Sequence, residues 1–300
     1  MNRPNPLLEN LELIAKQVVE GFIIGLHKSP FHGFSVEFAE HRLYNQGDPL
    51  RHIDWKVYAR TDKMFIKRFE EETNLRCCLV IDTSSSMHFP ENADKMNKLE
   101  FSCLSAACLL QLLKRQLDAV SLVVFDEKIN FLSDCRSAHS HYRMLTNELE
   151  KILQYKAANK KTNAVQALHL IAEQMHKRSL IVVFSDMMDD VENIEELFSA
   201  LQHLKYNKHE VILFHIMDGI QELSFEYENR PYEFVDMESG ERIKLQPQQI
   251  KEQYVAQMGQ FQEMIKNRCH QYQIDRVPVD LSAPVEQVLH AFLLRRNKLL

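Results

Sequence analysis

The sequence predicts a doubly wound α/β fold with a mostly parallel central sheet. From about residue 75 onward, short and almost continuous apolar runs alternate with segments whose apolar residues recur at helical spacing. Strands that are apolar on both faces are typical of parallel sheets covered by helices on both sides. Several runs end in an acid or a hydroxyl residue. These endings predict a polar carboxyl edge, where open α/β sheets bind their ligands.

The elements of this pattern follow one another in order. The predicted strands cover residues 75–82, 119–126, 179–186, 209–218 and 274–281. The predicted helices cover residues 98–116, 142–153, 163–177, 193–205, 250–272 and 285–296. Segment 128–134 follows its predecessor after a short turn. It is therefore expected to be an antiparallel edge strand, because parallel neighbours need a long crossover.

Two pieces stand outside the alternation. Residues 1–74 form an amphipathic N-terminal helix and a β-rich extension, with β-like stretches near 34–38 and 64–69. Residues 219–247 contain two short β-like runs joined by a turn at 238–241, which predicts a β-hairpin insertion. We expect a main domain at 75–300 that carries this insertion, with residues 1–74 packed on it.

Composition limits the class of protein. The chain has 300 residues, 45% of them hydrophobic and 26% charged, which is ordinary for a globular protein. Its formal charge of −6 argues against a dedicated nucleic-acid binder. The 6 cysteines form no CxxC pair, which indicates reduced thiols. The sequence shows neither a signal peptide nor an apolar stretch long enough to span a membrane, so a cytoplasmic location is expected.

The sharpest motif is VIDTSSSM, at the end of the first apolar strand. Asp82, Ser84 and Ser86 are spaced two residues apart, so in an extended loop their oxygens point the same way. Asp186 ends a later strand, and Thr162 lies in the loop before the helix at 163–177. In a parallel sheet these loops meet at one edge, and oxygen ligands suit a hard cation such as Mg²⁺.

This set resembles the metal-ion-dependent adhesion site of von Willebrand factor A domains. The resemblance implies that Ser84, Ser86 and Thr162 contact the ion, which is Mg²⁺, Mn²⁺ or Ca²⁺. It implies that Asp82 and Asp186 act largely through water. An open coordination position would accept an acidic side chain of a protein partner.

A second resemblance covers nearly the whole chain, at roughly residues 20–296. Segment 25–72, together with FVDMESGERIKLQP and the final LLRR, is similar to the bacterial "domain of unknown function 58" family. Its marks are Ser29, Gly33, Glu37, Phe38, Arg42, Tyr44, Gly47, Asp48, Arg51, Ile53, Asp54, Trp55, Ala59, Arg60 and Glu72. The resemblance implies a non-enzymatic adaptor whose partner is a MoxR-type AAA+ ATPase. Unlike many relatives, this chain has Lys160 and Lys161 before the loop threonine and shows no membrane helix.

Other interpretations stay open. The DTSSSM loop could only cap the N-terminus of the next helix. Pairing of Arg51, Asp54 and Arg60 could be purely structural. Acids and hydroxyls around Mg²⁺ could also serve a hydrolase or phosphotransferase, although the chain lacks both GxxxxGK[ST] and GxSxG. A metal-free structural assembly protein is a third alternative.

Overall fold

A computed structural model describes residues 6–23, 37–43, 53–70, 75–91, 95–154, 164–175, 178–188, 194–237 and 239–298. The chain divides into two compact units. The larger comprises residues 1–30 and 76–300, and the smaller comprises residues 31–75. The N-terminal helix therefore belongs to the same unit as the main sheet.

The larger unit is built on a six-stranded sheet with the strand order β10-β7-β6-β3-β4-β5. All neighbouring strands are parallel except β4 and β5, which are antiparallel. This confirms the predicted edge strand at 128–134. The strands are β3 (Arg76–Asp82), β4 (Ala119–Phe125), β5 (Ile129–Leu132), β6 (Leu180–Ser185), β7 (Glu210–Met217) and β10 (Asp275–Asp280).

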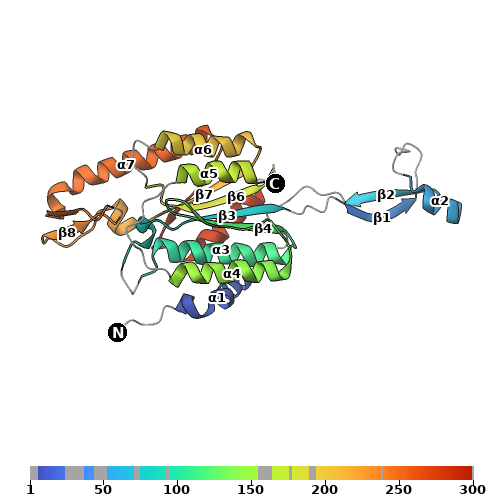
Figure 1. The fold of residues 1–300 in the computed structure, drawn as a ribbon, viewed down its shortest axis with the longest axis horizontal. Coiled ribbons are helices and arrows are strands. Elements are labelled where there is room, and N and C mark those ends of the chain that lie inside the picture. The colour runs from blue at the N-terminus through green and yellow to red at the C-terminus, as the bar shows by residue number, and fades with distance from the viewer. Residues whose placement is uncertain are drawn as a thin grey trace. The chain divides into compact units, whose positions relative to one another are not determined.

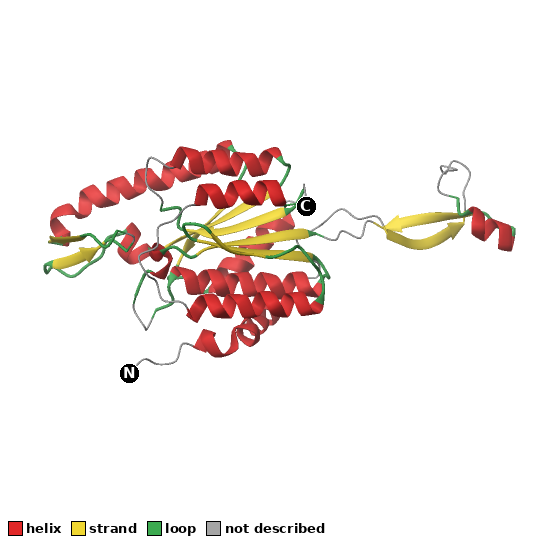
Figure 2. Ribbon diagram, in the orientation of Figure 1, coloured by secondary structure: helices red, strands yellow, loops and turns green. Residues whose placement is uncertain are grey.

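Helices cover both faces of the sheet, as Figures 1 and 2 show. One face carries α1 (Pro6–Ile23), α3 (Lys98–Arg115), α4 (His139–Gln154) and α8 (Val285–Lys298). The other carries α5 (Ala164–Gln174), α6 (Ile194–Tyr206) and α7 (Pro247–Gln271). The predicted α/β class with a mostly parallel sheet and helices on both sides is confirmed.

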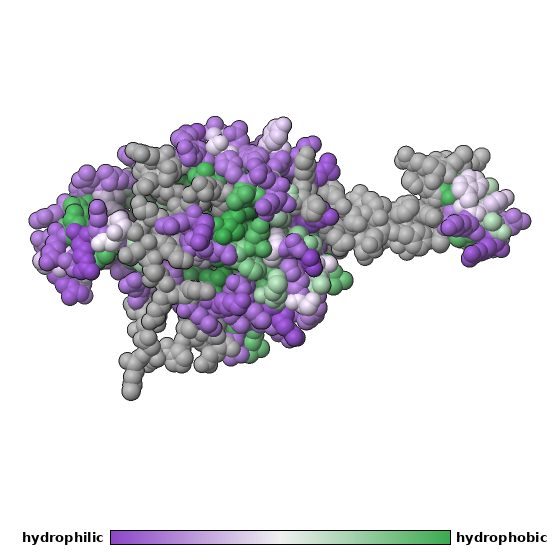
Figure 3. Space-filling model, in the orientation of Figure 1, coloured by the Kyte–Doolittle hydropathy of each residue, from purple (hydrophilic) through white to green (hydrophobic). Residues whose placement is uncertain are grey.

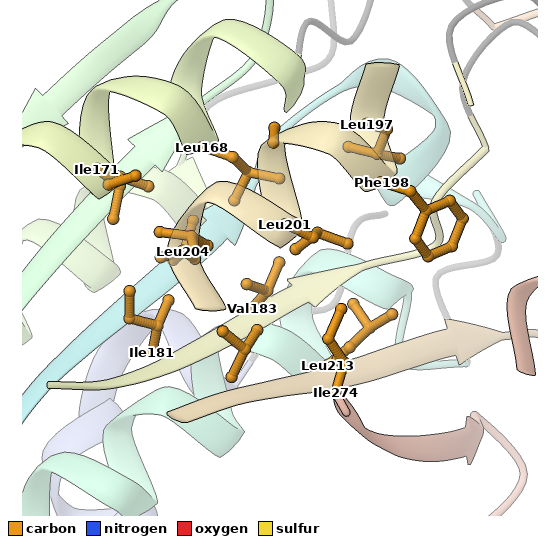
Figure 4. Packing of buried hydrophobic residues seen from close by; sticks show 14 of the residues in the cluster. Leu168, Ile171, Ile181, Val183, Leu197, Phe198, Leu201, Leu204, Leu213 and Ile274 are labelled. Atoms are coloured by element: carbon orange, nitrogen blue, oxygen red, sulfur yellow. The ribbon is translucent and has the colours of Figure 1, made fainter. Parts of the chain in front are cut away.

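The central strands are buried on both faces, which explains their continuous apolar sequences. Every described side chain of β6 is buried, as are all those of β3 after Arg76. On one face, side chains of α5 and α6 interlock with those of β6 and β7 (Figure 4). The residues labelled there are Leu168, Ile171, Ile181, Val183, Leu197, Phe198, Leu201, Leu204, Leu213 and Ile274.

The other face is organised around α3. All of its residues except Glu100, Lys114 and Arg115 are buried, because α1 and α4 cover the side of α3 that faces away from the sheet. Helix α1 presents Leu11 and Ala15, both 0% exposed, to this layer. The apolar residues of α1 recur at helical spacing and pack against this layer, as expected of an amphipathic helix.

Both outer strands of the sheet are short or interrupted. Strand β5 has four residues, and the chain then returns so that Arg136 forms an antiparallel bridge with Val120 of β4. Strand β10 contains Pro278, which has no N–H to donate. Such features are typical of the edges of natural sheets.

A second, two-stranded antiparallel sheet consists of β8 (Tyr232–Val235) and β9 (Arg242–Leu245). An isolated pair of strands is marginally stable. Here an aromatic cluster connects it to α7: the Phe225 ring lies 4.3 Å from that of Tyr254 and 5.7 Å from that of Phe234. Phe225 is the buried centre of this cluster.

The smaller unit contains β1 (Glu37–Leu43) and β2 (Phe65–Glu70), paired antiparallel, with α2 (Trp55–Thr61) between them in the chain. The predicted β-like stretch at 64–69 corresponds to β2, whereas the one at 34–38 overlaps β1 only at residues 37 and 38, and the short helix was not predicted. The Asp54 carboxylate caps α2 by accepting hydrogen bonds from the N–H groups of Lys56 and Val57 at 3.0 and 3.2 Å. Arg51 lies outside the described residues, and Asp54 has a structural task in this helix cap.

Hydrophilic side chains cover much of the outer surface of α6 and α7 (Figure 3). In the described part of the chain, no helix combines the length and apolar character needed to cross a membrane.

His209, between α6 and β7, gives a prediction about pH. It is 1% exposed, and its Nδ1 accepts a hydrogen bond from the Ser179 N–H at 3.2 Å. Burial lowers the pKa of His209 below its ordinary value of 6.5. The unfolded chain therefore takes up a proton at this side chain first as the pH falls below about 6.5, so acidification destabilises the folded state.

We expect His209→Asn, which keeps an acceptor for Ser179 but does not titrate, to lose less stability than wild type between pH 7.5 and 5.5. Urea unfolding midpoints at both pH values measure this. Equal losses in the two proteins would show that His209 does not contribute to the pH dependence.

Candidate metal centre

The predicted acidic and hydroxyl residues meet at the carboxyl ends of two neighbouring strands. Strands β3 and β6 pair directly, and Asp82 ends the first while Asp186 follows the second. The Ser185 hydroxyl donates a hydrogen bond to Asp82 Oδ2 at 2.8 Å, which connects the two strand ends. The structure thus brings Asp82, Ser84, Ser86 and Asp186 to one edge. Thr162, with Lys160 and Lys161 before it, lies outside the described residues.

The loop after β3 orients its hydroxyls without using them as helix caps. Asp82 Oδ1 accepts a hydrogen bond from the Ser84 N–H at 3.0 Å, and the hydroxyls of Ser84 and Ser86 share a hydrogen bond of 3.1 Å. A 3₁₀ turn, η2 (Ser85–His88), follows, and the Ser84 side chain makes no capping hydrogen bond to it. The cap of α3 comes instead from Asn97 and Glu100, which form a reciprocal capping box.

Asp82 is a fully buried carboxylate. It is 0% exposed and accepts hydrogen bonds from the Ser84 N–H and the Ser185 hydroxyl. Burial raises the pKa of Asp82 to about 7, and the nearby carboxylate of Asp186 adds to this rise. A site that raises the pKa of a carboxyl group in this way favours any process that brings positive charge to it.

Asp186 already has a cation beside it. The Lys98 ammonium, from the first residue of α3, donates hydrogen bonds to Asp186 Oδ2 at 2.7 Å and to Glu222 Oε1 at 2.6 Å. Asp186 Oδ1 accepts from the Met188 N–H at 3.1 Å. Burial alone would lower the pKa of Lys98, but the carboxylates of Asp186 and Glu222 outweigh burial, and the pKa is raised. Lys98 is therefore charged.

Glu222 reaches Lys98 from a π-helical turn, η3 (Gly219–Leu223), that follows β7. Its second oxygen accepts a hydrogen bond from the Asp218 N–H at 2.8 Å. A Cβ atom at Gly219 would lie 2.2 Å from Asp280 Oδ2. A larger residue at this position would therefore have to displace the Asp280 side chain.

A buried histidine holds the backbone of Asp186. His215, in β7, has its Nε2 2.9 Å from the Asp186 carbonyl oxygen, and its Nδ1 lies 2.8 Å from Arg276 Nη2. Burial, with the Arg276 guanidinium, lowers the pKa of His215 to about 4. The ring is therefore neutral, with Nδ1 accepting from Arg276 and Nε2–H donating to Asp186.

The donor set fits a hard divalent ion held mainly by hydroxyl oxygens. Neighbouring ligands of an octahedral Mg²⁺, each about 2.1 Å from the ion, lie roughly 3 Å apart. The hydroxyls of Ser84 and Ser86, which share a hydrogen bond of 3.1 Å, have a spacing compatible with this geometry. In the described residues, no three His, Cys, Asp or Glu side chains gather closely enough to hold a metal by themselves. A softer ion such as Zn²⁺, which prefers nitrogen and sulfur ligands, would find few of them here.

Sequence patterns predict the loop residues but not Lys98, Glu222, His215 or Arg276. Their partners lie far away in the chain: Asp186 is 88 residues from Lys98, and Glu222 is 124. One signal was available. Lys98 is the first residue of its helix, and a lysine at a helix N-terminus is unfavourable for the helix dipole.

The family model described as "Protein of unknown function DUF58" matches residues 40–263, and the chain belongs to this family. Uncharacterized proteins of Mycobacterium bovis and Mycobacterium tuberculosis are 24% identical to it over 211 residues. The match covers 70% of this chain and 64% of each relative, so the chain spans somewhat less than two thirds of their length.

Solved structures align with much of this chain. One is the conserved hypothetical protein BatB of Bacteroides thetaiotaomicron, with a TM-score of 0.44 and 16% identity over 75% of this chain and 99% of that one. Another is an aerotolerance-related membrane protein of Bacteroides fragilis, with a TM-score of 0.46, 16% identity and the same two coverages.

The contacts of His215 give a prediction about stability. His215→Leu removes the donor to the Asp186 carbonyl and the acceptor for Arg276 while keeping a similar volume. We expect a loss of about 1–3 kcal/mol in the free energy of unfolding, because buried polar groups lose their partners. Urea denaturation measures it, with His290→Leu on α8 as a histidine control away from these contacts. Equal stability of wild type and His215→Leu would contradict the assigned role.

Proposed function

We propose that this chain is a metal-dependent protein-binding module of the von Willebrand A type. In this proposal Ser84, Ser86 and Thr162 hold a Mg²⁺ ion, and Asp82 and Asp186 support it from the ends of β3 and β6. In the same proposal, residues 219–247 are a β-hairpin insertion within this module. The observation that supports this proposal most directly is the pair of hydroxyls of Ser84 and Ser86. They lie 3.1 Å apart, beside two buried carboxylates, and the Ser84 side chain does not cap the turn that follows.

The choice of ion follows from the ligand types. Hydroxyl and carboxylate oxygens suit Mg²⁺, with Mn²⁺ or Ca²⁺ as substitutes. Few carboxylates contact the ion directly in this arrangement, so the ion keeps much of its positive charge. When bound, it supplies a coordination position for an acidic side chain of a protein partner.

Burial of the acids favours binding over catalysis. Asp82 is 0% exposed, and each of its oxygens accepts a hydrogen bond from the protein. A nucleophilic or general-base carboxylate must reach its substrate directly or through one water. The position two residues after Asp82, where phosphotransferases that use an aspartate nucleophile place an acid, is Ser84. These features support a non-enzymatic role.

The class of partner comes from the family resemblance. Members of the DUF58 family tend to be encoded beside MoxR-type AAA+ ATPases, so an adaptor for such an ATPase is the partner role that we propose. A cytoplasmic location accords with it, since that is where these ATPases act.

The metal site makes a prediction about thermal stability. A ligand that binds only the folded state stabilises it by mass action, by about 2.7 kcal/mol at a hundredfold excess over Kd. We expect Mg²⁺ and Mn²⁺ to raise the melting temperature of wild type, and Ser84→Ala and Ser86→Ala to abolish the rise.

Thr83→Val is the matched control, because the Thr83 hydroxyl in the same loop donates to the Phe125 carbonyl at 2.8 Å instead of facing the site. It should keep the metal-dependent rise. Identical melting of wild type with Mg²⁺, Mn²⁺ and EDTA would instead favour a metal-free assembly protein.

The adhesion function is tested by capture of partners from the native cell extract. Asp82→Asn is the variant of choice, because an amide keeps hydrogen bonds with the Ser84 N–H and the Ser185 hydroxyl while removing the charge. We expect wild type to retain an acidic partner with Mg²⁺ and to lose it with EDTA, and the variant to lose it in both. A partner retained in all four conditions would place the contact elsewhere. Phosphoesterase activity that disappears in Asp82→Asn would replace the binding proposal with a hydrolase.

A further inference from the structure

We propose that Lys98 is a fixed cation of this site. In this proposal, its ammonium neutralises Asp186 and Glu222 so that the carboxyl edge of the sheet folds without a divalent ion. The same charge weakens the binding of such an ion. The first part stands on the contacts of Lys98, and the second also rests on the proposed function.

The contacts show a cation enclosed by the protein. Lys98 is 0% exposed, and its Nζ lies 2.7 Å from Asp186 Oδ2 and 2.6 Å from Glu222 Oε1. The ring of Phe89 lies on another side, with its centroid 5.8 Å from Nζ. Removing one partner of a buried ion pair is strongly destabilising, because it leaves the other charge unpaired in a medium of low polarity. Both carboxylates depend on this one ammonium.

Helix stability does not explain a lysine at this position. Lys98 is the first residue of α3, where the helix dipole favours negative charge. Its backbone is nonetheless fixed there, since the Lys98 N–H donates to the Phe89 carbonyl at 3.0 Å and Asn97 caps the helix. The ammonium is unfavourable for the helix, so its contacts with the two carboxylates are what account for a lysine at this position.

The same contacts bear on the ion. The two oxygens of Asp186 accept hydrogen bonds from Lys98 and from the Met188 N–H, so this carboxylate is already partly neutralised. A divalent ion near Ser84 and Ser86 would be repelled by the ammonium and would gain less from Asp186. An uncharged side chain of similar length at position 98 should therefore make the site bind the ion more tightly.

The test compares wild type with Lys98→Met, Lys98→Arg, Glu222→Gln and the double variant Lys98→Met/Glu222→Gln. In EDTA, we expect Lys98→Met to melt about 10 °C below wild type, because it leaves two buried carboxylates unpaired. Lys98→Arg should recover much of the loss. The double variant should melt above Lys98→Met, since it removes one of the unpaired charges.

Metal binding is the second readout. If Lys98 served only the fold, its replacement would not tighten the binding of the ion. By titration calorimetry with Mg²⁺ alone, we expect Lys98→Met to bind about tenfold more tightly than wild type. If Lys98→Met does not fold in EDTA, the double variant is compared with Glu222→Gln, and the same tightening is expected.

The outcomes separate the two proposals. Melting of Lys98→Met within about a degree of wild type in EDTA would overturn the neutralising role, and unchanged or weaker Mg²⁺ binding would overturn its effect on the ion. A double variant no more stable than Lys98→Met would also count against neutralisation. Absence of Mg²⁺ binding to wild type and variants alike would overturn the proposed function and the effect on the ion, while the EDTA melting still decides the neutralising role.

Discussion

The carboxyl edge of the sheet depends on how three acids and one lysine are buried together. Asp82, Asp186 and Glu222 are each 9% exposed or less, and a buried carboxylate is costly unless it is paired and hydrogen-bonded. The Lys98 ammonium pairs with two of them, and backbone N–H groups and the Ser185 hydroxyl serve the remaining oxygens. The loop after β3, the end of β6 and the turn after β7 are therefore held to one another by charge as well as by packing.

These charges bear on the proposed binding of an acidic partner. With all three acids ionised, as a bound ion would favour, the acids and Lys98 carry a net charge of −2, and a divalent ion would bring the site to neutrality. Without the ammonium, the loaded site would remain negative and would repel an incoming carboxylate. On the proposed function, Lys98 would therefore lower the affinity for the ion and raise the affinity for an acidic group that the ion binds.

Sequence reasoning predicted what depends on neighbours in the chain. Parallel strands such as β6 are buried on both faces, so their apolar runs are evident, and the spacing of Asp82, Ser84 and Ser86 is local. The sequence could not indicate that Lys98 meets Glu222, because only the folded sheet brings them together. Helix α2 was missed for another reason: it has only seven residues and rests on a single capping side chain, Asp54.

The two outer strands of the sheet restrict how other molecules can approach it. Pro278 interrupts the hydrogen-bonding potential of β10, and β5 is only four residues long. A foreign strand added at β10 would meet one residue that has no N–H to donate, and a strand added at β5 would have only four residues to pair with. Interrupted and short outer strands of this kind are the means by which natural sheets limit edge-to-edge association of one copy with another.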